Sequence, residues 1–323
     1  MTIRRRVVVG ALLALGSMTV SAQGAYPSRP VKIIVPFGAG GFTDVVARIV
    51  GQKLGAAMGG SFVIENKPGA GSTIGADLVA KAAPDGYTLM MISSTHTISP
   101  SIYKSLPYDP IRSFTPIGKL VDSAYVLVVN PGKVSANNVK DFIALAKARP
   151  DAVHYASSGN GSTQHLMGGL FVSMAGAPLK HIPYRSSNLA MTDLVSGVVE
   201  SSFAGLTNAQ PHLATGKLKA LAVTTANRAP QLPQVPTLHE AGVAGYDASN
   251  WLALVGPAGM PRDIVQKLNQ EIGRLMELPD TQKALFDAGV QASTSSPEEL
   301  STLMQVEMGK WARIIKDAGI EMQ

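Results

Sequence analysis

The chain has 323 residues, of which 46% are hydrophobic and 15% charged, and its formal net charge is +6. This composition is typical of a packed globular protein, and the scattered Lys and Arg residues give no support to nucleic-acid binding. Cysteine is absent, which excludes disulfides, thiolate metal sites and cysteine nucleophiles.

The first residues have the pattern of an export signal. Arg4–Arg6 form a positive segment, residues 7–15 are apolar, and Val20-Ser21-Ala22 offers small residues for cleavage. We therefore expect a signal peptide over residues 1–22 and a soluble mature protein in the periplasm. Three of the positive charges lie in the signal, so the mature chain carries 6 − 3 = +3.

After the signal, short apolar runs alternate with segments of helical spacing. The pattern predicts strands over 31–36, 61–65 and 87–93 and helices over 44–58 and 73–83. This order is typical of a mostly parallel sheet with helices on both faces, and thus of the α/β class.

The middle of the chain repeats the same order, and the last part is mainly helical. We expect strands over 124–129, 153–156, 179–183, 198–203, 220–223 and 250–255, and helices over 139–148, 163–174, 262–276, 281–287 and 297–318. Two such sets predict two lobes: residues 23–125 with 251–323, and residues 126–250. Strands 124–129 and 250–255 are the candidate hinges.

A glycine-rich turn joins the first strand to the first helix. Backbone N–H groups at a helix start lack partners within the helix, and the helix dipole favours negative charge there. The turn is therefore a candidate cradle for an anion, or alternatively a tight turn in which Thr43 or Asp44 caps the helix. It lacks the lysine of a phosphate loop and the third glycine of a dinucleotide site. The candidate ligand contacts are Phe37, Gly38, Ala39, Gly40, Gly41, Thr43 and Asp44.

Two further polar loops follow predicted strands, in the place where open α/β sheets bind ligands. Either is also explained as a capped turn. The candidate contacts in these loops are Ser93, Ser94, Thr95, His96, Ser158, Gly159, Asn160, Ser162, Thr163 and, one turn into the next helix, His165.

Enzyme chemistry has weaker support. The six histidines show no metal-ligand spacing, and no Gly-x-Ser-x-Gly segment follows a strand. We expect no cofactor, no metal and no catalytic residue, although a Ser-His-Asp triad assembled in space would leave no local pattern.

Many ordered segments of the mature chain resemble one family, the Bug-type solute-binding receptors of tripartite tricarboxylate transporters. The resemblance is carried by the Pro-Phe-x-x-Gly-Gly-x-x-Asp turn ending at Asp44 and by the segments 26–30, 65–71, 83–87, 106–110, 155–161, 181–184, 216–224 and 233–237.

The resemblance implies a two-lobed periplasmic-binding-protein fold of the second type, with the ligand in a cleft between the lobes. In this family the Gly40-Gly41-x-x-Asp44 turn holds a carboxylate through backbone groups and waters, and Tyr184 lies near the ligand. The family often has an acidic residue in the segment 201–205, where this chain has Ala204, and often has proline or alanine in place of Gly38 and Phe42.

The resemblance implies a monomeric receptor that passes a small di- or tricarboxylate or aromatic acid to integral membrane subunits. Two alternatives stay open at this point. One is a sensor subunit that presents its ligand to a membrane kinase, and the other is a periplasmic hydrolase.

Overall fold

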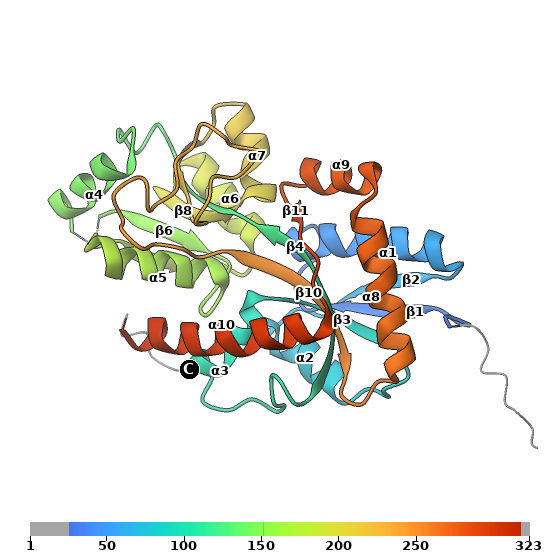
Figure 1. Ribbon diagram of the computed structural model, residues 1–323. Coiled ribbons are helices and arrows are strands. Elements are labelled where there is room, and N and C mark those ends of the chain that lie inside the picture. The colour runs from blue at the N-terminus through green and yellow to red at the C-terminus, as the bar shows by residue number, and fades with distance from the viewer. Residues whose placement is uncertain (1–25, 151, 318–323) are drawn as a thin grey trace, which may run out of the picture.

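The computed structural model describes residues 26–150 and 152–317, which form two β-sheets, each with helices on both faces (Figure 1). The signal predicted over residues 1–22 lies outside the described residues. Within the two described ranges, no helix has the length and apolar character needed to cross a membrane.

The first sheet has six strands. β1 pairs in parallel with β2 and β3, as the predicted order requires, whereas β10 runs antiparallel between β3 and β4. In sheet order the strands are β11 (Gln291–Ala292), β4 (Phe114–Ser123), β10 (Asn250–Pro257), β3 (Thr88–Ser93), β1 (Val31–Val35) and β2 (Phe62–Asn66).

The second sheet has five strands. β6 is parallel to β7 and β8, and β5 is antiparallel to β8 and β9. In sheet order the strands are β7 (Lys180–Pro183), β6 (His154–Ser157), β8 (Ser201–Gly205), β5 (Tyr125–Val129) and β9 (Lys219–Val223). We call the parts built on the two sheets the first and the second lobe.

Helices cover both faces of each sheet because successive strand residues point to opposite faces. In the first lobe these are α1 (Phe42–Met58), α8 (Arg262–Met276) and α9 (Pro279–Asp287) on one face and α2 (Thr73–Ala80), with the start of α10 (Pro297–Asp317), on the other. The 3₁₀ helix η1 (Ala70–Ser72) precedes α2. In the second lobe they are α4 (Val139–Ala148) and α5 (Thr163–Ala175) on one face and α6 (Ser187–Ser196) and α7 (Leu206–Ala214) on the other.

Two helices join the cores of both lobes. α10 packs Leu300 and Met304 against the first sheet, but Trp311, further along, lies fully buried in the second lobe's cluster with Phe142 and Phe171. Figure 1 shows α10 lying along both lobes. The second bridging helix is α3 (Ser94–Ile102), which follows β3 and contributes Ile98 and Ile102 to the same second-lobe cluster. The lobes therefore share apolar packing on one side.

The predicted elements correspond to most observed ones, although the short strand β11 and the 3₁₀ helix η1 were not predicted. Three further differences bear on the site. The segment around Ser94 and Thr95, predicted as a loop, is the first turn of α3, with Ser93 as its cap. β4 was not predicted, since Pro116 and Gly118 interrupt its apolar pattern. Strand β5 lies wholly within the second sheet and β10 wholly within the first, so neither candidate hinge strand crosses between the lobes. The chain crosses at Ala124 and again in the segment 224–249.

Candidate ligand-binding site

The turn before α1 is organised by Asp44. One carboxylate oxygen of Asp44 accepts hydrogen bonds from Gly40 N and Arg48 Nε, both at 2.9 Å. The other accepts from Asn66 Nδ2 at 2.9 Å and from Arg48 at 3.0 Å. The Asn66 amide also donates to the carbonyl of Phe37, so one carboxylate ties both ends of the turn together.

The charge of Asp44 is neutralised within the protein. Burial raises the pKa of its carboxyl, but hydrogen bonds from Arg48, Gly40 and Asn66 outweigh burial and hold the pKa below its ordinary value. Asp44 is 2% exposed and stays ionised against Arg48. Its side chain therefore shapes the turn and leaves little net negative charge to repel an anion.

The start of α1 keeps unused hydrogen-bond donors. Its N-cap residue is Gly41, and no side chain among the described residues caps the helix. The N–H groups of Phe42, Thr43 and Asp44 form the first turn, where an α-helix offers no internal acceptor. A 17-residue helix adds a favourable dipole for an anion at this end.

Two glycines of this turn have different roles. Gly40 has a φ of +74°, which favours glycine, whereas Gly41 has a φ of −80° that any residue adopts. A Cβ on Gly40 would lie 3.8 Å from Nδ2 of Asn188 at the start of α6. The turn therefore faces the second lobe, together with the exposed Gly38 and Ala39.

The starts of α3 and α5 meet between the lobes. Oγ1 of Thr95 lies 3.0 Å from Oγ1 of Thr163, and Oγ of Ser94 lies 3.4 Å from the same atom. Asn250 Oδ1 accepts a 2.6 Å hydrogen bond from Ser94 Oγ, and its amide nitrogen lies 3.4 Å from the hydroxyl of Tyr125. We call these five buried residues the hydroxyl cluster. All five are uncharged at neutral pH, and burial raises the pKa of Tyr125 above its ordinary value.

The loop before α5 is held by side chains from its own lobe. Ser158 N donates to Oε1 of Gln164 at 2.8 Å, and Ser162 Oγ accepts from His165 N at 3.3 Å to cap the helix. Gly159 has a φ of +118° and a Cβ there would lie 3.3 Å from the carbonyl oxygen of Tyr184. Asn160 at the tip of the loop is exposed.

Two stacked histidines support this loop from behind. The rings of His165 and His181 are 3.9 Å apart, His165 Nδ1 accepts from Gly161 N at 3.1 Å, and His181 Nε2 lies 2.6 Å from Ser157 Oγ. Burial lowers the pKa of His165 to about 4, and burial with the neighbouring His165 lowers the pKa of His181 to about 3. Both rings are therefore neutral at neutral pH.

Three predicted contacts have clear structural roles elsewhere. His96 is 1% exposed, its Nε2 donates to the carbonyl of Pro110 at 2.9 Å, and its ring packs against Tyr108 and Phe114. Ala204 is fully buried on the face of β8 that packs under α6 and α7. The Tyr184 hydroxyl donates to Asp193 at 2.8 Å, and burial together with this carboxylate raises the pKa of Tyr184 to about 12.

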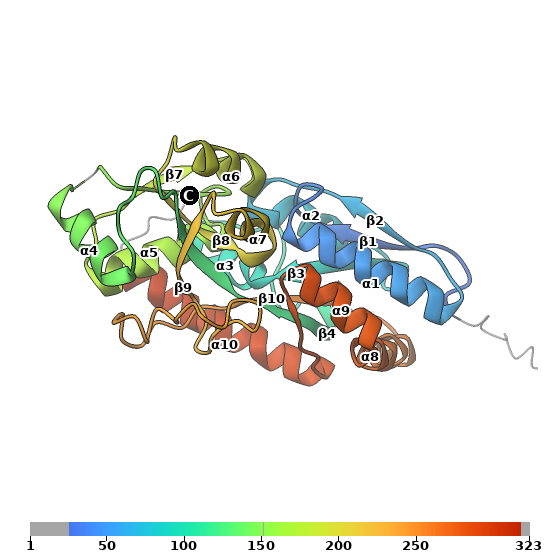
Figure 2. The ribbon, with the colours of Figure 1, turned by 90° about the horizontal axis from the view of Figure 1, so that it is seen from above.

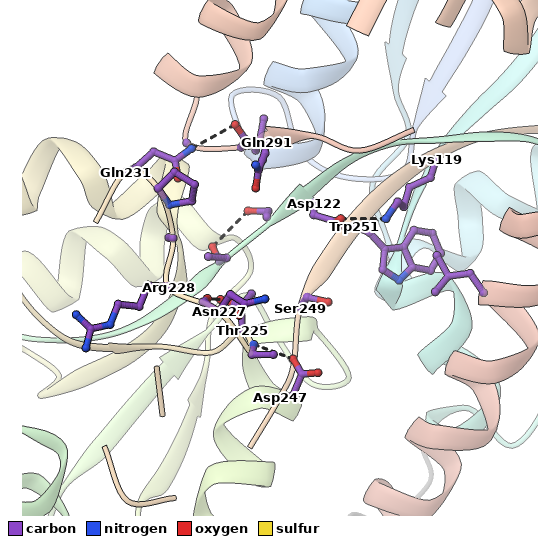
Figure 3. Close-up of a pocket in the computed structure, with 18 of the residues that line it drawn as sticks. Lys119, Asp122, Thr225, Asn227, Arg228, Gln231, Asp247, Ser249, Trp251 and Gln291 are labelled. Atoms are coloured by element: carbon purple, nitrogen blue, oxygen red, sulfur yellow. Dashed lines mark hydrogen bonds and ion pairs between the residues drawn. The ribbon is translucent and has the colours of Figure 1, made fainter. Parts of the chain in front are cut away.

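Two hollows lie where the lobes meet. One, of about 660 Å³, is lined by Gly40 and Val45 of the first lobe and by residues of α6 and α7, including Asn188, Thr207 and Asn208. Figure 2 shows α6 and α7 beside the start of α1. The other, of about 340 Å³, is the hinge groove, and Figure 3 shows its lining by Lys119, Asp122, Trp251 and the segment 225–231. None of the predicted ligand contacts lines the hinge groove.

Sequence reasoning missed the residues that hold the site together. Arg48 lies four residues after Asp44, which is the helical spacing of an ion pair and could have been recognised. Asn250, Tyr125 and Asn66 reach their partners only through tertiary contacts. Gln164 accepts from Ser158 N in the loop just before its helix, but the spacing of six residues follows no helical or capping pattern. Among the described residues, no group of three or more His, Cys, Asp or Glu side chains is arranged to hold a metal ion.

Two relatives match nearly the whole of this chain. It is 36% identical to the UPF0065 protein in the tcbD-tcbE intergenic region of Pseudomonas sp. strain P51, over 97% of this chain and 94% of that protein. It is 34% identical to protein BugT of Bordetella pertussis strain Tohama I, over 99% of both chains.

Solved structures of similar sequence have the same fold. R. palustris Rpa4515 with adipate has a TM-score of 0.88 and 34% identity, over 92% of this chain and 100% of that one. Periplasmic binding protein BugD has a TM-score of 0.86 and 36% identity, with the same coverage. MatC from Rhodopseudomonas palustris with bound malate has a TM-score of 0.83 and 31% identity, over 90% of this chain and 100% of that one.

The fold is thus that of the periplasmic binding proteins, as predicted. Residues 46–320 match the model of the TctC family, the tripartite tricarboxylate transporter family receptor. The chain belongs to this family of solute-binding receptors.

Proposed function

We propose that the protein is a periplasmic receptor that captures a small carboxylate, such as a di- or tricarboxylate or an aromatic acid, between its two lobes. One observation carries the proposal: the start of α1 faces the second lobe with uncapped N–H groups, beside an acidic residue that Arg48 already neutralises. Such a helix start favours a carboxylate through both hydrogen bonds and the dipole. Adipate and malate bound to two similar proteins support the same class of ligand.

The hydroxyl cluster suggests how the rest of the ligand is bound. Ser94, Thr95 and Thr163 come from both lobes and offer neutral hydroxyl groups that donate or accept. We infer that they contact polar atoms of the ligand beyond the carboxylate held at α1. Ala204 is fully buried under α6 and α7 and is not part of this group of contacts.

We further infer that the protein acts in the periplasm and delivers its ligand to integral membrane subunits of a tripartite transporter. The signal pattern over residues 1–22 and the family of the chain support this inference. Ligand transfer requires a conformation that opens, which the crossing at Ala124 and the segment before β10 allow.

The binding test uses protein purified from the periplasmic fraction, where N-terminal sequencing should find a chain beginning at or shortly after Gln23. Calorimetry with adipate, malate, citrate and benzoate should then identify at least one ligand. The methyl ester of that ligand should bind poorly, since it lacks the anionic oxygen for which α1 provides donors. A chain beginning at Met1, or no binding by any organic acid in a broad screen, would contradict the proposal.

A substitution in the turn locates the carboxylate. Gly41→Val suits the backbone, because φ is −80° and ψ is 171°, so the left-handed strain expected of a turn glycine applies to Gly40 instead. Its Cβ would lie 3.3 Å from the carbonyl oxygen of Gly38 and would block close approach to the α1 N–H groups. We expect binding to weaken at least about tenfold, or roughly 1.4 kcal/mol. A variant with wild-type circular dichroism and wild-type affinity would place the carboxylate elsewhere.

A further inference from the structure

The turn between α9 and β11 touches the second lobe without room for a side chain. A Cβ on Gly289 would lie 2.7 Å from the backbone N of Thr207 and 3.0 Å from its Cα. These are backbone atoms at the start of α7, which cannot rotate away as a flexible side chain can. Gly289 also has a φ of +77°, so glycine is favoured here by both conformation and space.

The residues on either side of Gly289 are hydrogen-bonded to the second lobe. The hydroxyl of Thr207 donates to the carbonyl of Ala288. Nε2 of Gln231, in the segment that leads back to β10, donates to the carbonyl of Val290 at 3.3 Å (Figure 3). Three successive residues of the first lobe therefore contact the second lobe directly, through backbone atoms on the first-lobe side.

This contact lies close to the point where the chain crosses between lobes. β11 pairs Gln291 with Asp122, two residues before Ala124, and the N–H of Leu206 donates to the carbonyl of Ala124 at 3.2 Å. A small displacement near a pivot becomes a larger one at a distance from it. The spacing between Gly289 and Thr207 thus influences how closely the two halves of the site approach each other.

We propose that Gly289 and Thr207 form a closure stop, a contact that sets the angle at which the lobes meet and so positions the two halves of the binding site. The inference rests on the proposed receptor function. Gly289 is a positioning residue, since it lines the hinge groove, which contains none of the predicted ligand contacts. Thr207 lines the hollow at the start of α1, so its variants are judged by lobe geometry as well as by affinity.

The test measures the distance between lobes directly. Because the chain has no cysteine, Gln52→Cys on α1 and Lys140→Cys on α4, both exposed, can carry two spin labels without other sites reacting. In this background Gly289→Ala should lengthen the mean distance between labels and weaken binding of the ligand found by calorimetry about tenfold or more. Gly259→Ala is the matched control, because Gly259 has a φ of +86° in the same lobe but no atom within 4 Å of its Cβ position.

Thr207→Val removes the hydroxyl and adds little bulk, so the proposal does not depend on Gly289→Ala alone. We expect Thr207→Val to broaden the distribution of distances between the labels toward longer values. Thr207→Ser keeps the hydroxyl and should give the wild-type distribution. The proposal is overturned if folded Gly289→Ala and Thr207→Val both give the distances of wild type and Gly259→Ala. The distances are also measured without ligand. An absence of carboxylate binding would therefore count against the proposed function, while the distances between the labels would still test the closure stop.

Discussion

At the scale of single residues, the arrangement around Asp44 changes what the glycine-rich turn can do. The sequence places an acid beside the candidate anion site, and an unpaired carboxylate there would repel the ligand. In the structure Asp44 forms an ion pair with Arg48, and its carboxylate oxygens also accept hydrogen bonds from Gly40 N and Asn66 Nδ2. The carboxylate therefore stabilises the turn's geometry, while the dipole and N–H groups of α1 remain available to the ligand.

The buried His96 should make stability depend on pH. Burial lowers the pKa of His96 from its ordinary value of 6.5 to about 4, so an unfolded chain binds a proton at this side chain that the folded chain excludes. Between about pH 6.5 and 4 the free energy of unfolding should therefore fall as pH falls, by up to about 1.4 kcal/mol per pH unit for this residue.

His96→Gln tests this dependence, because the glutamine amide can still donate to the carbonyl of Pro110. Urea unfolding at several pH values from 7 to 4.5 should give the variant a shallower slope than wild type. Part of the slope should remain, since burial also lowers the pKa values of His165 and His181. Equal slopes for the two proteins would show that His96 is protonated without cost.

At the scale of elements, helix starts carry the candidate site, and only some could be recognised in advance. The helical spacing of α1 predicts that helix from the sequence alone. α10 begins with a capping box, in which Ser296 and Glu299 exchange hydrogen bonds of 2.8 and 3.1 Å. α3 was not predicted, because its first turn of serine, threonine and histidine favours loops and caps. Burial between the lobes stabilises this helix.

α10 should stabilise the molecule through its end as well as its start. Trp311 is fully buried in the second-lobe core and donates to Glu307 at 2.8 Å. We expect Trp311→Ala to lower the free energy of unfolding by about 3–5 kcal/mol. Val306→Ala on the same helix, where the side chain is 62% exposed, should change it by less than about 0.5 kcal/mol. Urea unfolding followed by circular dichroism measures the free energy of unfolding of both variants. Similar values for the two would show that the end of α10 does not stabilise the second lobe.

At the scale of the whole molecule, the two lobes are joined at Ala124, by the segment 224–249 and by the shared packing of α3 and α10. The lobes should therefore move by bending about the side where α3 and α10 pack, so that the molecule opens on the opposite side, between α1 and α6.

Small-angle scattering should detect this motion. Addition of a saturating carboxylate should reduce the radius of gyration, because the ligand stabilises the conformation in which both lobes contact it. The Gly41→Val variant at the same ligand concentration should keep the larger radius. A radius unchanged by saturating ligand would indicate that the lobes form a rigid pocket.

The amino-acid sequence by itself determined the α/β class, the alternation of strands and helices, and the glycine-rich turn as a candidate anion site. These features follow from local periodicity and from backbone preferences, which neighbouring residues set. Only the tertiary structure decided that Asp44 is neutralised, that His96 packs inside the first lobe, and that Asn250 and Thr163 meet at the hydroxyl cluster. These contacts join residues far apart in the chain, so their geometry depends on how the two sheets pack and leaves no pattern in a local window of sequence.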